Sequence, residues 1–114
     1  MRTKPCLPSI TEAEFQRQVL QLARINGWRS AHFRPAKTAR GWRTPCQGDA
    51  KGFPDLVLVK PGRPGRLLFV ELKRLGAWLT GEQKDWIHAL EDAGAQVFVW
   101  RPSDWPEIEK ELSR

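Results

Sequence analysis

Three charged residues, Asp55, Glu71 and Lys73, have the side-chain types and the spacing of a metal-assisted hydrolytic site. Each carboxylate belongs to an apolar stretch typical of a β-strand, and the Pro-Gly-Arg-Pro-Gly sequence at 61–65 indicates a turn between the two stretches. If that turn centres on Arg63, Asp55 faces Glu71 across an antiparallel pair, with Cβ atoms roughly 5 Å apart. Lys73 is two residues beyond Glu71, and strand alternation places both side chains on one face.

Two carboxylates placed in this way repel each other, whereas a divalent cation between them makes the arrangement favourable. Mg²⁺ or Mn²⁺ is the expected cofactor, because hard cations take oxygen ligands and one or two carboxylates with waters form a typical site. A lysine beside the ion can orient the attacking water and offset charge that develops on a scissile phosphate. The alternative is purely structural: Glu71 and Lys73 form a salt bridge at the sheet edge, and Asp55 caps a loop.

The predicted elements around these residues define an α/β fold. A capping pattern of Thr11 and Glu14 begins a first helix that Gly27 ends, and Thr80 with Gln83 begins a second helix. Because the strands are apolar on both faces, we expect helices to cover the sheet on both sides. The predicted strands are 28–33, 55–59, 67–73 and 96–100, and a terminal helix runs from Asp104 to near Leu112.

Positive charge is concentrated in the first half of the chain. Residues 1–51 carry ten lysines and arginines against three acidic residues, and the whole chain has a net charge of +6. A polyanion such as DNA is the expected partner, with a merely solvated basic surface as the alternative. Residues 34–54 are predicted to form a long basic loop. The candidate phosphate contacts in it are Arg34, Lys37, Arg40 and Arg43. Trp42 and Trp78, both in predicted loops, are candidates for stacking on bases.

The length of 114 residues predicts a single domain, residues 1–114, with residues 1–9 as a flexible N-terminal tail. No stretch approaches the ~20 apolar residues that span a bilayer, and the N-terminus lacks the apolar run of a signal peptide. Only Cys6 and Cys46 are present, so a reduced cytoplasmic protein is favoured over one with a disulfide between them.

Three motifs resemble a known nuclease family. Gly52-Phe-Pro-Asp-Leu56, Phe69-Val-Glu-Leu-Lys73 and Leu79-Thr-Gly-Glu-Gln83 are similar to the VRR-NUC branch of the PD-(D/E)XK nucleases. The similarity extends from about Ile10 to Leu112 and is greatest to the short stand-alone members typical of phages and bacteria. The resemblance implies a restriction-endonuclease-like αβββαβ core, a mixed four-stranded sheet flanked by helices, here with an extra C-terminal helix.

The resemblance also implies roles for individual residues. Asp55 and Glu71 would bind the metal, with the Leu72 carbonyl as a further ligand. Lys73 would be the catalytic lysine. Gln83 matches the family's glutamine near the active site, and its alternative role is in the capping box of the second helix; one residue can have both roles.

A carboxylate of the first helix often completes the site in such nucleases, and Glu12 and Glu14 are the two candidates. The apolar stripe of that helix is centred about 35° from Glu12 and about 125° from Glu14 on a helical wheel. We therefore expect Glu12 to point toward the sheet and join the metal site, with Gln16 one turn later as a further candidate. Glu14 has a local role in the capping pattern, and acids are favoured in the first turn of any helix.

These observations together predict a DNA endonuclease that hydrolyses phosphodiester bonds with Mg²⁺ or Mn²⁺. The resemblance implies selectivity for branched DNA such as a Holliday junction over plain duplex, and a junction has two strands to cut. Because one chain offers one site, a two-fold homodimer is expected. The alternatives are a non-catalytic DNA-binding module of the same fold, a sequence-specific restriction-type nuclease and an RNA-directed nuclease.

Overall fold

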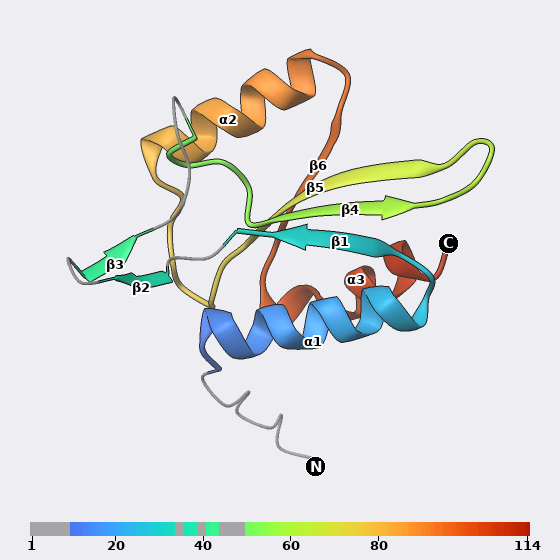
Figure 1. Ribbon diagram of the computed structural model, residues 1–114, viewed down its shortest axis with the longest axis horizontal. Coiled ribbons are helices and arrows are strands. Elements are labelled where there is room, and N and C mark those ends of the chain that lie inside the picture. The colour runs from blue at the N-terminus through green and yellow to red at the C-terminus, as the bar shows by residue number, and fades with distance from the viewer. Residues whose placement is uncertain (1–9, 34–35, 39–40, 44–49) are drawn as a thin grey trace, which may run out of the picture.

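The chain forms a central sheet with helices on both of its faces (Figure 1). The computed structural model describes residues 10–33, 36–38, 41–43 and 50–114. Its helices are α1 (Glu12–Ile25), α2 (Gly81–Asp92) and α3 (Trp105–Leu112), the last preceded by a 3₁₀ turn at Pro102–Asp104. The strands of the central sheet are β1 (Arg29–His32), β4 (Leu56–Lys60), β5 (Arg66–Leu72) and β6 (Gln96–Trp100). The predicted α/β order with an extra C-terminal helix is confirmed.

The central sheet is mixed, with the strand order β1-β4-β5-β6. β4 pairs antiparallel with β1 and β5, whereas β6 runs parallel to β5 after the crossover through α2. The β4–β5 register pairs Leu56 with Val70, which centres the hairpin on Arg63 as predicted. One further step of the same register brings Asp55 opposite Glu71.

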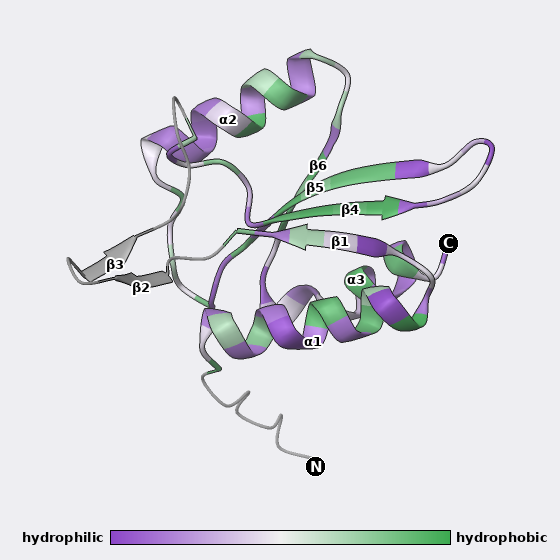
Figure 2. Ribbon diagram, viewed as in Figure 1, coloured by the Kyte–Doolittle hydropathy of each residue, from purple (hydrophilic) through white to green (hydrophobic). Residues whose placement is uncertain are grey.

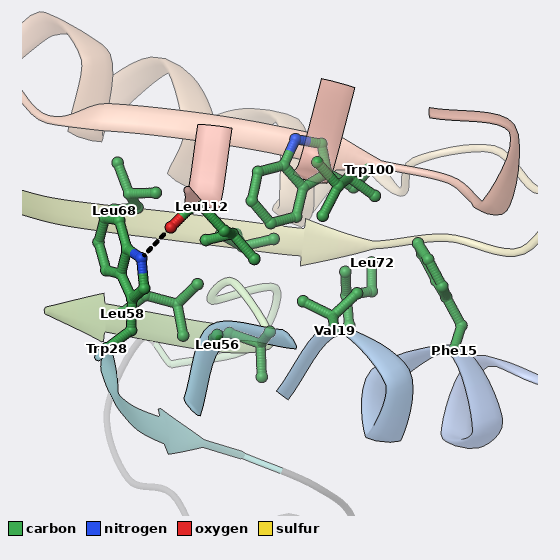
Figure 3. Close-up of a cluster of buried hydrophobic side chains, with 12 residues drawn as sticks. Phe15, Val19, Trp28, Leu56, Leu58, Leu68, Leu72, Trp100 and Leu112 are labelled. Carbon is green, nitrogen blue, oxygen red and sulfur yellow. Dashed lines mark hydrogen bonds between the residues drawn. The ribbon is translucent and has the colours of Figure 1, made fainter. Parts of the chain in front are cut away.

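One face of the sheet packs against α1 and α3 and contains the hydrophobic core (Figure 3). Its fully buried side chains are Phe15, Val19, Ala23, Leu56, Leu58, Leu68, Val70, Ile108 and Leu112. The Trp28 indole N–H donates to the Leu112 carbonyl at 2.8 Å, which ties the end of α3 to the start of β1. Lys60 and Arg66 lie over the same indole, 5.9 and 5.1 Å from its centre, so the hairpin is also fixed to this face.

The opposite face is covered only in part. α2 has 12 residues, none of them buried, and spans about 18 Å. Figure 2 shows α2 as mostly hydrophilic, while β4 and β5 are hydrophobic over most of their length, with hydrophilic ends at the hairpin turn. Val59 and Leu67, opposed across the two strands, remain 40% and 47% exposed. The expectation that helices cover both faces is therefore wrong for the outer half of the hairpin, because α2 is too short to reach it (Figure 1).

Part of the segment predicted as a long basic loop is a small antiparallel sheet. β2 (Ala36–Thr38) pairs with β3 (Gly41–Arg43), with Lys37 opposite Trp42. The prediction of an irregular loop over 34–54 is wrong for these strands, because three residues are too few to display an alternating pattern. The predicted tail at 1–9 and both cysteines lie outside the described residues.

No helix in the described part of the chain is both long enough and apolar enough to cross a membrane.

Candidate active site

Asp55 is hydrogen-bonded on two sides at the end of the sheet, to β5 and to the residue after β1. It immediately precedes β4, and its Oδ2 accepts the Leu72 backbone N–H of β5 at 2.8 Å. Its own carbonyl accepts the Phe33 N–H, just past β1, at 3.0 Å. The position of this carboxylate is therefore set by backbone hydrogen bonds rather than by a free loop.

Glu71 lies opposite Asp55 and is almost fully buried, with 2% of its surface exposed. Its Oε1 accepts the Gln83 Nε2–H at 3.0 Å, whereas Oε2 has no hydrogen-bond partner among the described residues. Burial, followed by the neighbouring Asp55 carboxylate, raises the pKa of Glu71 to about 9. Burial also raises the pKa of Asp55, although the bond from the Leu72 N–H opposes this. At neutral pH the pair thus holds a proton whose place a cation can take.

Lys73 follows directly after β5 and is 9% exposed. Its backbone N–H donates to the Trp100 carbonyl at 2.9 Å, so the neighbouring β6 strand fixes its position. Burial raises the pKa of both carboxyls, and the Lys73 ammonium counteracts that increase. No salt bridge joins Glu71 to Lys73 among the described residues, so the purely structural edge pair does not form there.

Gln83 makes both of the contacts that the sequence left open. Its backbone N–H donates to the Thr80 hydroxyl at 3.2 Å, and its side-chain oxygen accepts the Thr80 N–H at 2.8 Å. The remaining amide group donates to Glu71. One side chain thus begins α2 and orients a carboxyl of the site.

Glu12 is the α1 carboxylate whose charge acts on the site. Burial is the main cause of the raised pKa of Asp55 and Glu71, and Glu12 raises both further. However, in the described part of the chain no three or more His, Cys, Asp or Glu are arranged to hold one ion. Direct ligation by Glu12 therefore stays a prediction.

The two other α1 candidates have local contacts. The Glu14 backbone N–H donates to the Thr11 hydroxyl at 3.1 Å and so caps α1. Gln16 is buried, with its Nε2 3.5 Å from the His32 Nδ1 of β1. The first contact caps α1 and the second joins α1 to β1, and neither reaches the two carboxylates.

The oxygen atoms gathered here fit a divalent cation. Glu71 Oε2 is a buried oxygen with no hydrogen-bond partner among the residues that the structure describes, and a cation would give it one. In an extended strand the N–H and C=O of one residue point to the same side, so the Leu72 carbonyl lies on the side where its N–H meets Asp55. Two carboxylates and a carbonyl are the donors that Mg²⁺ takes in proteins.

The segment before Asp55 is anchored on the first turn of α2, a feature that the sequence analysis missed. Gly52 has φ +86°, and a Cβ there would lie 2.5 Å from the Glu82 backbone carbonyl carbon. The Lys51 ammonium is 3.4 Å from the Glu82 carboxylate. The Phe53 ring meets three other rings edge to face: Phe33, Phe69 and Trp86. The Gly-Phe-Pro-Asp sequence was the available signal, since glycine permits both the positive φ and the close approach.

The predicted DNA contacts lie wholly or partly outside the residues that the structure describes. Arg34 and Arg40 lie outside the described residues. Lys37 belongs to β2, and Trp42 and Arg43 belong to β3, but their side chains are outside the described part of the structure. Their roles in binding stay predictions.

A match to a known family accompanies this geometry. The model of the VRR-NUC domain matches residues 7–104 of the 114-residue chain. No curated protein and no solved structure matches the chain. The mixed four-stranded sheet with its flanking helices is compatible with a restriction-endonuclease-like fold. Since the match covers most of the chain and includes every residue of the carboxylate site, the chain belongs to the VRR-NUC domain family, a nuclease family of the PD-(D/E)XK superfamily.

Proposed function

We propose that this protein is a Mg²⁺- or Mn²⁺-dependent DNA endonuclease with Asp55, Glu71 and Lys73 as its catalytic residues. The observation that carries the proposal is the buried Glu71 Oε2, which has no donor among the described residues and lies beside a second carboxylate. A sheet built only for stability gains nothing from this arrangement, because two acids occupy neighbouring buried positions and one of them must stay protonated at neutral pH.

Asp55, Glu71 and the Leu72 carbonyl would hold the cation. When bound, the cation supplies a nucleophilic hydroxide at neutral pH and neutralises charge on the phosphoryl oxygens. Gln83 holds the Glu71 carboxyl in one orientation, and the Leu72 N–H does the same for Asp55. The site is thus organised before substrate arrives, which is how electrostatic catalysis avoids reorganisation during the reaction.

Lys73 acts on the reacting groups. Hydrolysis forms a bond between a water oxygen and phosphorus and breaks one P–O ester bond. A proton leaves the attacking water, and the departing oxygen gains one. The Lys73 ammonium, fixed through its backbone to β6, orients the water and offsets the negative charge that builds on the phosphate.

The proposed substrate is DNA, with branched forms such as a Holliday junction preferred to plain duplex. The basic first half of the chain supplies the attraction to phosphates. A junction requires two cuts and one chain carries one site, so the proposed active form is a homodimer with two-fold symmetry. The proposed setting is the reducing cytoplasm, where DNA and free Mg²⁺ are both available.

The test is a cleavage assay on a four-way junction and on a linear duplex of the same sequence. We expect cleavage with Mg²⁺ or Mn²⁺ and none with EDTA, and the junction to be cut faster. Lys73→Ala should lower the cleavage rate by at least about 100-fold while DNA binding persists. Lys84→Ala, which removes the same charge from an exposed position on α2, is the matched control and should cut normally.

Each other outcome identifies a rival. Wild-type protein that shifts DNA but cuts it with neither metal is a binding module. Cleavage confined to one short sequence indicates a restriction-type enzyme, and faster cleavage of a matched RNA indicates an RNA-directed nuclease. Equal rates on junction and duplex would remove the structure selectivity and leave a general nuclease.

A further inference from the structure

The segment 74–80 connects two residues of the proposed site. It leaves β5 after Lys73 and enters α2 three residues before Gln83, at the end of the sheet away from the hairpin turn (Figure 1). Trp78 is five residues from each of them, so its Cα lies at most about 18 Å from either. Trp78 therefore lies within a distance of the proposed site that a bound DNA strand can span.

Trp78 is 86% exposed, and Leu75 in the same segment is 44% exposed. Two other tryptophans of the described chain, Trp28 and Trp100, are buried in the core. Leaving an indole in water forgoes the free energy that burial of a large aromatic provides. Exposure of such a ring beside an active site therefore indicates a contact that forms only with a ligand.

The backbone on both sides of Trp78 is held in place. The Arg101 guanidinium donates to the Ala77 carbonyl at 2.9 Å, and the Ala77 N–H donates to the Arg74 carbonyl at 3.2 Å. On the other side, Thr80 is fixed by the capping box that begins α2. A ring on a fixed backbone loses little conformational freedom when it binds, so Trp78 is suited to act as a platform.

We propose that Trp78 stacks on an unpaired base of the DNA strand next to the scissile phosphate. Every base has a π-face, so a lone exposed indole recognises any unpaired base, whereas the faces of bases within a duplex are already occupied. The exposed Arg74 beside it supplies positive charge for the adjacent phosphate. A protein partner is the weaker fit, because one indole and one leucine provide far less than the ~800 Å² per side of a stable interface.

This inference deepens the proposed function, since it makes a base that is unpaired or opened at the branch point the feature that distinguishes branched from duplex DNA. It is tested by binding alone, so that it can fail or succeed independently of cleavage. The probe is a fluorescent single-stranded oligonucleotide, and a blunt duplex of equal length is the comparison. The full chain is used in EDTA, and fluorescence anisotropy measures the affinity.

Trp78→Ala should weaken binding of the single strand by roughly 5- to 150-fold and leave duplex binding unchanged. Trp78→Phe should recover most of the loss, because a phenyl ring also stacks. The fold-change should be the same at low and high salt, unlike the loss of a phosphate contact. Ile25→Ala is the matched control: it removes another exposed apolar side chain, 73% exposed, at the far end of α1.

A series of strands with one abasic position completes the test. At the position that meets Trp78, loss of the base should weaken wild-type binding and leave the Trp78→Ala variant unaffected. The proposal is overturned if Trp78→Ala weakens single strand and duplex equally, if no abasic position removes its effect, or if it changes the mass of the protein in light scattering. An absence of cleavage by wild type would refute the nuclease proposal and leave this result intact.

Discussion

Leu58 and Val59 are neighbours in β4, but they belong to two very different regions of the molecule. Leu58 points into the face covered by α1 and α3, where it is fully buried among other aliphatic side chains. Val59 points to the α2 face, where the hairpin extends beyond the helix and the valine stays partly in water. Farther along that second face, the buried side chains are Glu71 and Lys73.

The difference indicates that the two faces of the sheet have different roles. The α1/α3 face contains the apolar contacts that stabilise the fold, so its composition resembles that of an ordinary protein core. The α2 face places a buried acid, an unmet acceptor and a lysine where apolar residues would be more stable. The apolar core and the proposed catalytic residues therefore lie on opposite sides of one sheet, and each can be altered separately.

The largest effect expected from this difference comes from the neighbouring pair in β4. Leu58→Ala should lower the free energy of unfolding by about 2–5 kcal/mol, because it leaves a cavity in the core. Val59→Ala, one residue away, should change it by less than about 0.5 kcal/mol. Denaturant unfolding of both variants measures the contrast. Equal losses would mean that the exposed half of the hairpin is covered in solution, which would remove the asymmetry between the faces.

On the α2 face we expect a smaller change in the free energy of unfolding, and in the opposite direction. Glu71→Gln should raise the free energy of unfolding in EDTA at pH 8, on the order of 1–3 kcal/mol, because the wild-type acid must take up a proton to be buried at that pH and glutamine need not. The same variant should lose cleavage. With saturating Mg²⁺ the wild type should become the more stable of the two proteins, since only the wild type gains from binding the ion.

The raised pKa of Glu71 should make the stability of the metal-free protein depend on pH. The unfolded chain releases the Glu71 proton near the ordinary pKa of 4.5, whereas the folded chain keeps it until about pH 9. Between these values the folded state binds more protons, so metal-free wild type should lose up to about 1.4 kcal/mol of stability per pH unit as pH rises. Glu71→Gln should lack this slope. A wild-type stability that increases over this range would contradict the buried, protonated acid.

The smallest effect compares two glycines with similar backbone angles. Gly52 and Gly76 have φ of +86° and +80°, so alanine is strained at either. Of the two, only Gly52 would bring the added methyl against backbone, that of Glu82 in α2, whereas at Gly76 no atom of the described residues lies within 4 Å. Gly52→Ala should therefore be the less stable variant by about 1–2 kcal/mol, as thermal melting can measure. It should also cleave more slowly, because Asp55 would shift. Equal melting temperatures would show that the segment around Gly52 can move away from the Glu82 backbone at little cost.

The sequence carried enough information for the centre of the site. A hairpin register follows from the position of its turn, so placing the turn at Arg63 was sufficient to set Asp55 opposite Glu71. The order of the long elements was also predictable, because their capping residues and apolar periodicity are local signals. The preference for Glu12 over Glu14 as a metal ligand stays a prediction, although the Glu12 charge is among the causes that raise the pKa of Glu71.

Other features depend on contacts between distant segments and have no local pattern. The approach of Gly52 to Glu82 joins residues thirty positions apart, and the bond from the Leu72 N–H to Asp55 is visible only once the strands are paired. The two contacts of Gln83 were left as alternatives because a capping box and an active-site amide require the same residue type. The incomplete cover of the sheet follows from the length and position of α2, which composition does not fix.

The way Lys73 is held has a consequence for the newly made polypeptide. Asp55 and Glu71 lie on one hairpin, sixteen positions apart, so they can meet while the chain is still being synthesised. The backbone of Lys73, however, is held by the carbonyl of Trp100, at the end of β6. Strand β6 must therefore be synthesised and paired with β5 before the backbone of Lys73 is held beside the two acids.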